Sequence, residues 1–497
     1  MSGIGEQTVP ESEKEASKGP VSKKSWMGFL KTLATFTGDL SSLTAPSFIL
    51  SGTSLLEYLS YWYEYPEIFV SIPDGKTPLE RMMNVLKWYI CGINREYASR
   101  NQSYGTEKKP LNPILGELLI GSWDSSKGKV DITVEQVSHH PPVSVCRAVC
   151  EEAGIEALNY NPYKCRFSGR TLAVSQPGQI RIHLKKYDET YYFNLPNLTL
   201  EGLWYMAPYI ELHNSTHIVS TTGYITKINY HGRGYFSGTK NSFKANVYKK
   251  GEKADYVVEG VWTGESKIRH KGEHDGTTFL DLRQLKPTPV TVAPIEQQGE
   301  YETRRVWRDV ARALAEGDYD AASSSKTRIE QEQRELRKRE RAEHRPWKCR
   351  FFKWDADNSG LRTAFGQFLQ EIVDRGTWVW TGDRLLNPTA DDDQTECVRG
   401  DSSSSLYDTT FTSEAANVSR NGSVSTDTSA RAAAVASDTL PSKPSSSFPS
   451  LSQPRPQILC MLLLPNNFHD DLLCMIHLIL LRLVHISLSL VRGWYDG

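Results

Sequence analysis

The sequence predicts an α+β fold dominated by antiparallel β-strands, which form a barrel or a strongly curved sheet. Residues 116–285 carry β-branched and aromatic side chains with a period of two, and Gly, Asn, Asp and Pro separate the segments. No long helical pattern interrupts this stretch, which favours consecutive antiparallel strands. Helical periods flank it in residues 53–100 and 299–345. A large barrel of this kind can enclose a ligand cavity.

The composition limits the class of protein. The chain has 497 residues, more than one domain usually contains, so we expect one very large domain with tails or two domains. Apolar residues make up 39% and charged residues 24%, which is enough for a large core. The formal net charge is −1, so the chain has no bulk attraction for nucleic acid. Any anion site must therefore be a local cluster.

The N-terminus combines a polar leader with a short amphipathic segment. Residues 1–24 are rich in Glu, Lys, Ser and Gly, so we expect a disordered leader, and they contain no apolar secretory signal. Ser25 is a candidate N-cap for a helix with one apolar face, formed by Trp26, Phe29, Leu30 and Leu33. This helix could pack permanently on the core, or it could be a movable lid or a membrane-surface helix.

Strands and helices can be assigned within the three central regions. The strand pattern is clearest in residues 129–137, 179–186, 190–203, 217–230 and 256–262. In residues 53–100, the side chains at helical spacing are expected to belong to the core: Leu79, Met82, Met83, Leu86, Tyr89, Ile90, Ile93 and Tyr97. Residues 326–345 are densely charged and are typical of a solvated helix.

The C-terminal part departs from globular composition. Residues 386–456 are rich in Ser, Thr, Asp and Ala, so we expect a disordered linker. The tail, residues 457–497, is apolar, and residues 472–491 are long enough to span a bilayer. Arg482 and two histidines oppose spanning. Anchoring by this tail, or an origin of the tail in a wrongly assembled reading frame, stays open.

The most unusual string is residues 135–142, where His139 and His140 are followed by two prolines. A proline disfavours the α region in the residue before it, so we expect an extended, stiff segment that fixes both imidazoles. Zinc needs further ligands at known spacings, and these are absent. The string could be structural, or it could form a site for an anion or another polar ligand.

Two further strings carry candidate anion-binding groups. Residues 107–117 form a turn before the strands, where Lys109 and exposed backbone N–H groups could hold a phosphate. Lys326, Glu330 and Arg334 recur every four residues, so they form one stripe of a helix in which Glu330 can hold both cations. An ordinary loop and a solvated stripe are the alternatives, unless the three strings meet.

Other common sites are excluded by their motifs. The chain has no P-loop and no Gly-x-Ser-x-Gly elbow, and the glycine-rich string at 232–238 is followed by no helix and is expected to be a turn. The eight cysteines include no CxxC pair, so we expect reduced thiols in a cytosolic protein. No cofactor and no metal are expected.

Taken together, these strings resemble the oxysterol-binding protein family of lipid-transfer proteins. Residues 135–142 match the highly specific signature of that family, and residues 108–117, 232–244 and 326–338 also match. The resemblance covers about residues 25–355, with a weaker echo to about 382. We therefore predict a short, single-domain member with its lipid-transfer domain at residues 25–385.

The resemblance implies a large, near-complete antiparallel β-barrel around a hydrophobic lipid tunnel, with flanking helices and an N-terminal lid at residues 25–45. Such proteins carry one lipid at a time, commonly phosphatidylinositol 4-phosphate, and several exchange it for a sterol. By matching position, the headgroup residues would be Lys109, Leu111, Asn112, His139, His140, Lys326, Glu330 and Arg334. The lid and its end would comprise Trp26, Phe29, Leu30, Leu33, Leu40, Ser41, Ser42, Leu43, Thr44 and Ala45.

The second lipid is less sharply indicated. Sterol-binding members recognise the sterol hydroxyl partly through a Gln, and this chain has Glu96 at the matching position, with Tyr97 and Arg100 nearby. A glutamate can accept a hydrogen bond, but a buried charge is costly. A sterol, or a different second lipid exchanged for the phosphoinositide, therefore stays open.

The resemblance also implies how the protein would work. We expect a non-enzymatic monomer that meets the endoplasmic reticulum, Golgi or other membranes transiently from the cytoplasm and binds no nucleic acid. Two other classes stay open. A metal-dependent hydrolase would use His139 and His140, and a lipid sensor would bind lipid without ferrying it.

Overall fold

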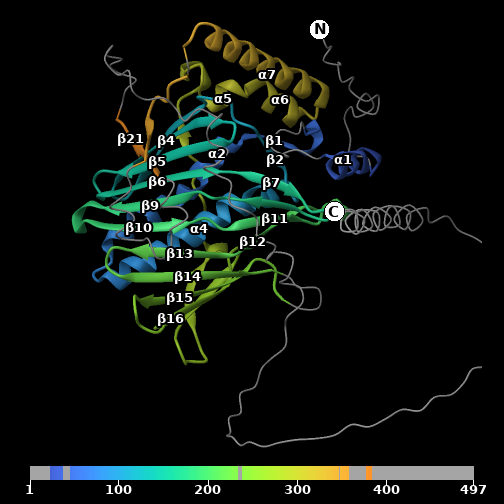
Figure 1. Ribbon diagram of the computed structural model, residues 1–497. Coiled ribbons are helices and arrows are strands. Elements are labelled where there is room, and N and C mark those ends of the chain that lie inside the picture. The colour runs from blue at the N-terminus through green and yellow to red at the C-terminus, as the bar shows by residue number, and fades with distance from the viewer. Residues whose placement is uncertain (1–22, 37–44, 233–237, 346, 357–375, 383–497) are drawn as a thin grey trace, which may run out of the picture. The chain divides into compact units, whose positions relative to one another are not determined.

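A continuous series of antiparallel pairings joins 13 strands into one large sheet (Figure 1). The computed structural model describes residues 23–36, 45–232, 238–345, 347–356 and 376–382. In spatial order the strands are β18 (Thr277–Asp281), β17 (Glu265–His270), β16 (Tyr256–Val261), β15 (Ser242–Lys249), β14 (Tyr224–His231), β13 (Ser215–Ser220), β10 (Glu189–Asn194), β9 (Gln179–Leu184), β6 (Ile155–Pro162), β5 (Pro142–Cys150), β4 (Gly128–His139), β3 (Leu118–Ser125) and β19 (Thr291–Val292). The predicted β-dominated α+β fold is confirmed.

Smaller sheets and helices complete the architecture. Four strands form a second sheet, β12 (Tyr209–His213), β11 (Asn197–Glu201), β8 (Leu172–Ser175) and β7 (Lys164–Phe167). Two strand pairs are β1 (Leu50–Ser54) with β2 (Lys109–Leu111) and β20 (Phe352–Asp355) with β21 (Thr377–Trp380). The α-helices are α1 (Lys23–Thr35), α2 (Leu55–Tyr58), α3 (Pro66–Val70), α4 (Pro78–Tyr104), α5 (Thr303–Val306), α6 (Arg308–Glu316) and α7 (Tyr319–Ala342).

Helix α4 forms the centre of the main core. Thr77 caps its N-terminus by accepting a hydrogen bond from Glu80 N at 3.2 Å, and Gly105 ends it with φ 69°. Its Tyr89 ring stacks on Phe193 of β10 at 5.8 Å. The Tyr89 hydroxyl is 2.7 Å from that of Tyr230 on β14. The helix is therefore fixed to strands from different parts of the sheet.

The strands follow the burial period that their sequence predicts. In β15, Phe243, Ala245 and Val247 are buried and the residues between them are half-buried. Strands β4, β5 and β6 are buried more continuously, because Phe351 and Trp378 of the C-terminal segment cover their second face. One end of the sheet is thus packed on both sides.

Several predicted boundaries were wrong. Residues 190–203 and 217–230 are each two strands rather than one, because Pro196 and Gly223 (φ 86°) lie at the breaks. Residues 53–100 contain several short helices before α4, with Pro66 and Pro73 beginning new turns. Helix α1 begins at Lys23, so Ser25 lies inside it and is not its N-cap.

Some predicted segments lie outside the described residues. These are most of the 1–24 leader, the turn at 233–237, the 386–456 linker and the 457–497 tail with its candidate span. None of the helices within the described parts of the chain has the length and apolar character needed to cross a membrane.

Two buried carboxylates join distant segments where β3 begins and β4 ends. Glu117 Oε2 accepts hydrogen bonds from Ile114 N at 2.9 Å and from the Trp307 indole at 3.0 Å, and its Oε1 accepts from Thr303 at 2.7 Å. Glu135 accepts from Arg350 N at 2.7 Å and from Phe351 N at 2.9 Å. Burial raises the pKa of Glu135 to about 7, although the hydrogen bonds from Arg350 and Phe351 favour the charged carboxylate and lower the pKa.

We expect Glu135→Ala to lower the free energy of unfolding by about 2–5 kcal/mol, because it leaves two backbone N–H groups without an acceptor. Chemical denaturation would measure this loss. The exposed Glu296→Ala should change the same free energy by no more than about 0.5 kcal/mol. Similar values for the two variants would contradict the anchoring role of Glu135.

Candidate functional site

The paired histidines lie at a tight turn between two neighbouring strands. His139 is the last residue of β4 and pairs directly with Pro142, the first residue of β5. The peptide bond between His140 and Pro141 is cis. The expected extended segment was therefore wrong, because the β4–β5 pairing reverses the chain within the string itself. The turn nevertheless holds the two imidazole rings 4.6 Å apart, at 65° to each other.

The hydrogen bonding of His139 assigns its tautomer. Nδ1 lies 3.0 Å from the carbonyl oxygen of Pro113, and a carbonyl only accepts, so Nδ1 carries the hydrogen. In the neutral ring, Nε2 is then an acceptor, and it donates only after protonation. Desolvation and the adjacent His140 lower the pKa of His139, although the carbonyl of Pro113 and Glu330 favour the charged form. An anion beside Nε2 would reverse this shift.

Lys109 lies on β2 with its ammonium group inside the site. Its Nζ donates to Asn112 Oδ1 at 2.8 Å, which ties the lysine to the following turn. Desolvation, followed by repulsion from Lys326, lowers the pKa of Lys109 to about 8. Glu330 opposes the shift. The positive charge of Lys109 is therefore only partly neutralised by the protein, so it is available to bind an anion.

The stripe of Lys326, Glu330 and Arg334 on α7 lies near Lys109 and His139. Lys326 donates to Glu330 Oε1 at 2.5 Å, and its side chain is only 12% exposed. Arg334 lies 4.0 Å from the other oxygen of Glu330 and is 68% exposed, so it can reorient toward a ligand. Ile329, between them, is buried in the core beneath. Burial of Ile329 thus fixes the rotation of α7, and with it the direction in which the stripe faces.

These strings meet at one place in the structure. Electrostatic interactions connect Glu330 with both His139 and Lys109. Lys109, Lys326 and Arg334 carry three positive charges, whereas Glu330 carries one negative charge. Asn112 lies beside Lys109, while Leu111 is fully buried and contributes packing rather than an exposed side chain. The local surplus of positive charge can bind an anion, although the whole chain is nearly neutral.

Helix α1 packs beside this cluster. Its four predicted apolar residues are buried in a second core cluster with Ala45 and Leu111, and with Trp307, Val310 and Ile329 of the segment from α5 to α7. The indole of Trp26 donates to the Leu203 carbonyl at 2.8 Å. The other predicted lid-end residues lie outside the described chain: Leu40, Ser41, Ser42, Leu43 and Thr44.

The three residues considered for a sterol, Glu96, Tyr97 and Arg100, lie in the C-terminal half of α4. Glu96 is buried and hydrogen-bonds with Tyr163, and its Oε2 has no hydrogen-bond partner among the described residues. Tyr97 and Gln176 exchange hydrogen bonds at 3.1–3.2 Å. Arg100 forms a buried ion pair with Glu107. These side chains form a polar region within the apolar interior.

Burial changes the protonation of Glu96. Desolvation raises its pKa to about 8, although Arg100 and the Tyr163 hydroxyl favour the charged form. The carboxyl group is therefore mostly neutral at pH 7. A neutral carboxyl both donates and accepts hydrogen bonds, as an amide side chain does. This removes the cost of a buried charge that the sequence alone implied.

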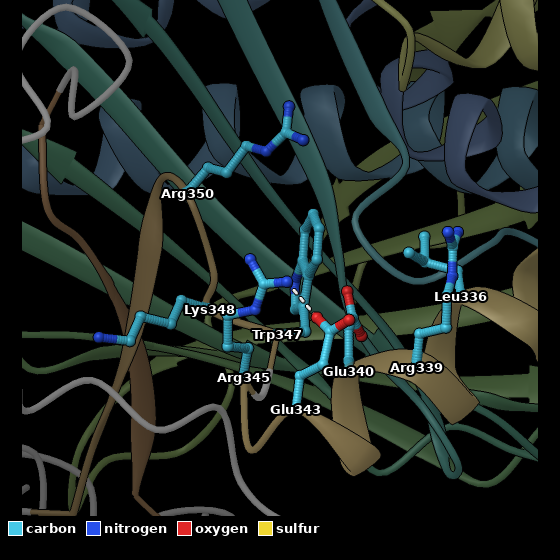
Figure 2. A pocket seen from close by; sticks show the side chains of 8 residues that line it. All are labelled: Leu336, Arg339, Glu340, Glu343, Arg345, Trp347, Lys348 and Arg350. Atoms are coloured by element: carbon cyan, nitrogen blue, oxygen red, sulfur yellow. Dashed lines mark hydrogen bonds and ion pairs between the residues drawn. The ribbon is translucent and has the colours of Figure 1, made fainter.

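A separate surface hollow lies beside the end of α7. Its volume is about 440 Å³, and its lining residues are Leu336, Arg339, Glu340, Glu343, Arg345, Trp347, Lys348 and Arg350 (Figure 2). The lining contains four cationic side chains and two carboxylates. Glu343 pairs with Arg345, whereas Glu340 lies 2.8 Å from Arg337, which does not line the hollow.

Sequence reasoning missed the residues that support the site. Glu117 and Glu135 lie inside the quoted strings, but their partners Thr303, Trp307 and Phe351 are far along the chain. The partners of residues 96–100, which are Tyr163, Gln176 and Glu107, carried no local signal either. No group of three or more His, Cys, Asp or Glu side chains placed to hold a metal occurs in the parts of the chain that the structure covers.

Comparisons with known proteins find one family. A family model described as oxysterol-binding protein matches residues 27–312 and 308–383. An oxysterol-binding protein homologue of Schizosaccharomyces pombe, C354.07c, is 59% identical over 383 residues, covering 77% of this chain and 96% of the relative. Protein kes1 of the same organism is 48% identical over 364 residues, covering 72% and 94%.

Solved structures give the same fold. The Osh1 ORD domain in complex with ergosterol has a TM-score of 0.60 at 20% identity, covering 75% of this chain and 89% of that chain. The Osh3 ORD of Saccharomyces cerevisiae in complex with PI(4)P has a TM-score of 0.53 at 22% identity, covering 68% and 89%. The predicted near-complete antiparallel barrel is thus confirmed as the fold.

The raised pKa of Glu96 predicts a pH-dependent stability. The fold favours the neutral carboxyl, so its contribution is complete below the ordinary pKa of 4.5 and is lost as pH rises toward 8. The loss is at most about 1.4 kcal/mol per pH unit. Since Gln stays neutral, Glu96→Gln should gain stability relative to the native chain between pH 5 and 8. Urea denaturation across this range would measure the difference, and a constant difference would contradict a buried, neutral Glu96.

Proposed function

The chain belongs to the oxysterol-binding protein family, and on that premise we propose that it binds and transfers lipids, carrying phosphatidylinositol 4-phosphate and a sterol one at a time. The observation that carries this proposal is the meeting of Lys109, His139 and the α7 stripe around a single carboxylate, Glu330. Such a cluster of cations suits a ligand with more than one phosphate group.

Each part of the cluster has a role that fits its chemistry. His139, His140 and Arg334 bind the 4-phosphate, because they lie at the outer end of the cluster with two accessible rings and an exposed guanidinium. Lys109 and the backbone at Leu111 and Asn112 bind the phosphate linked to glycerol. Lys326 and Glu330 bind the inositol hydroxyls, for which an ammonium and a carboxylate supply a donor and an acceptor.

Protonation is part of headgroup binding. Nδ1 of His139 is committed to the Pro113 carbonyl, so only the charged ring can donate from Nε2 to a phosphate oxygen. A phosphomonoester with a charge near −2 supplies the field that raises the pKa of this ring. Headgroup affinity therefore increases as pH falls, until the phosphate itself becomes protonated near pH 6.

The sterol part rests on the polar region at Glu96. Its neutral carboxyl has an oxygen without a described partner, which suits the single hydroxyl of a sterol. Arg100 favours the charged carboxylate of Glu96, and Glu107, which forms an ion pair with Arg100, opposes this effect. The ergosterol and PI(4)P ligands of the related ORD domains support the same two cargoes here.

Transfer follows from competition for one interior site. At a membrane, α1 moves off the core and a lipid enters. The lid then closes and hides the apolar surface from water. A gradient of phosphatidylinositol 4-phosphate can drive the sterol in the opposite direction, without covalent chemistry. We place this exchange on the cytoplasmic faces of membranes such as the endoplasmic reticulum and Golgi, with a monomer as the working unit.

We expect the double variant His139→Ala, His140→Ala to lose phosphoinositide extraction by roughly 100-fold, because it removes two charge-assisted hydrogen bonds. Sterol binding should stay within about twofold of the native chain, because the rings lie outside the polar region of α4. Extraction of each lipid from vesicles of known composition would measure both effects.

A matched control is the double variant His231→Ala, His274→Ala, which removes two exposed imidazoles, one at the end of β14 and one in the connection between β17 and β18. It should extract both lipids as the native chain does. Equal loss of both lipids in the His139, His140 variant, with folding intact, would contradict the headgroup assignment.

A further inference from the structure

An exposed aromatic side chain projects from the connection between β11 and β12. Three large hydrophobic side chains of the described residues are exposed: Tyr205 at 84%, Tyr104 at 49% and Ile120 at 39%. Tyr205 therefore presents far more apolar surface to solvent than the other two. An exposed aromatic ring of this kind indicates a contact surface rather than part of the core.

The backbone around Tyr205 is fixed by local bonds. Gly202 has φ 74°, and a Cβ there would collide with the Ala207 carbonyl oxygen. Tyr205 N and Ala207 N both donate to the Gly202 carbonyl, at 3.1 and 3.2 Å. Leu203 is buried at 2% exposure and anchors the base. The turn at residues 202–207 thus holds Tyr205 outward, so its exposure is built into the fold.

The turn is joined directly to helix α1. The Trp26 indole donates to the Leu203 carbonyl at 2.8 Å. Trp204 and Met206, on either side of Tyr205, pack partly buried against the core cluster that contains the apolar face of α1. Phe167 of β7, Leu172 of β8 and Leu200 of β11 pack against the same cluster. Figure 1 shows α1 on the side of the molecule where β7 and β11 lie. Any surface that binds Tyr205 therefore also lies close to α1.

The charged side chains of α1, beside the turn at residues 202–207, are all positive. The exposed positions of α1 include Lys23, Lys24 and Lys31, and the helix contains no acidic residue. Arg166 and Arg170 are exposed on the β7–β8 hairpin, whose Phe167 packs against the same cluster. An aromatic ring with a polar tip, flanked by cations, matches the interface of an anionic bilayer.

We propose that the turn at residues 202–207 is a membrane-docking element, which inserts Tyr205 at the headgroup level of an anionic bilayer beside α1. This inference rests on the proposed function, in which α1 is the lid. Docking through the turn holds α1 at the bilayer surface, where lipid can replace the contacts that Trp26 and its neighbours lose on opening. The turn thus couples arrival at a membrane to release of the lid.

The test uses co-sedimentation of the full chain with vesicles of phosphatidylcholine, with or without about one-third phosphatidylserine. We expect Tyr205→Ala to weaken binding to the anionic vesicles by roughly three- to tenfold, and Tyr205→Trp to retain it. Ile120→Ala is the matched control, because it removes another exposed large apolar side chain, on β3. It should bind as the native chain does.

Binding of Tyr205→Ala equal to that of the native chain would overturn the proposal, as would an equal loss in Ile120→Ala. A change in oligomeric state for Tyr205→Ala, with unchanged vesicle binding, would assign the surface to self-association instead. Native mass spectrometry of lipid retained by each variant separates the two hypotheses. A chain that docks through Tyr205 but carries no lipid would contradict the proposed function and leave the docking element standing.

Discussion

The candidate headgroup site depends on two buried carboxylates, which hold late segments of the chain against the start of β3 and the end of β4. Glu117 binds Thr303 and Trp307 just before α6, and Glu135 binds the backbone of Phe351 after α7. Helix α7 lies between these two attachments in sequence, so its charged stripe is held over the β4–β5 turn. Both carboxylates have pKa values raised by burial, which shows that the fold tolerates their desolvation in exchange for these bonds.

The site uses local rather than overall charge. The chain has a formal net charge of −1, yet Lys109 and Lys326 lie close enough for their repulsion to lower the pKa of Lys109. Glu330 offsets only part of this. Lys109 and His139 both have lowered pKa values, and an anion bound beside either group would raise its pKa again. Ligand binding and proton uptake are therefore coupled at this end of the protein.

Local patterns predicted most of what depends on local sequence. The period of two in residues 116–285 predicted the antiparallel sheet, and the spacing of Trp26, Phe29, Leu30 and Leu33 predicted the buried face of α1. Contacts between distant segments were not predictable, because one sequence gives no signal that Glu96 meets Tyr163 or that Trp26 bonds to Leu203. The histidine turn was misjudged for the same reason, since strand pairing overrode the local preference of its prolines.

The most direct test of lipid exchange is an assay with two vesicle populations. One population contains phosphatidylinositol 4-phosphate and the other a sterol, and labelled reporters follow both lipids at once. The account predicts that the two lipids move in opposite directions at coupled rates, and that removing either lipid slows the other. Movement of the phosphoinositide alone would contradict the sterol assignment at Glu96, and binding without movement of either lipid would contradict transfer itself.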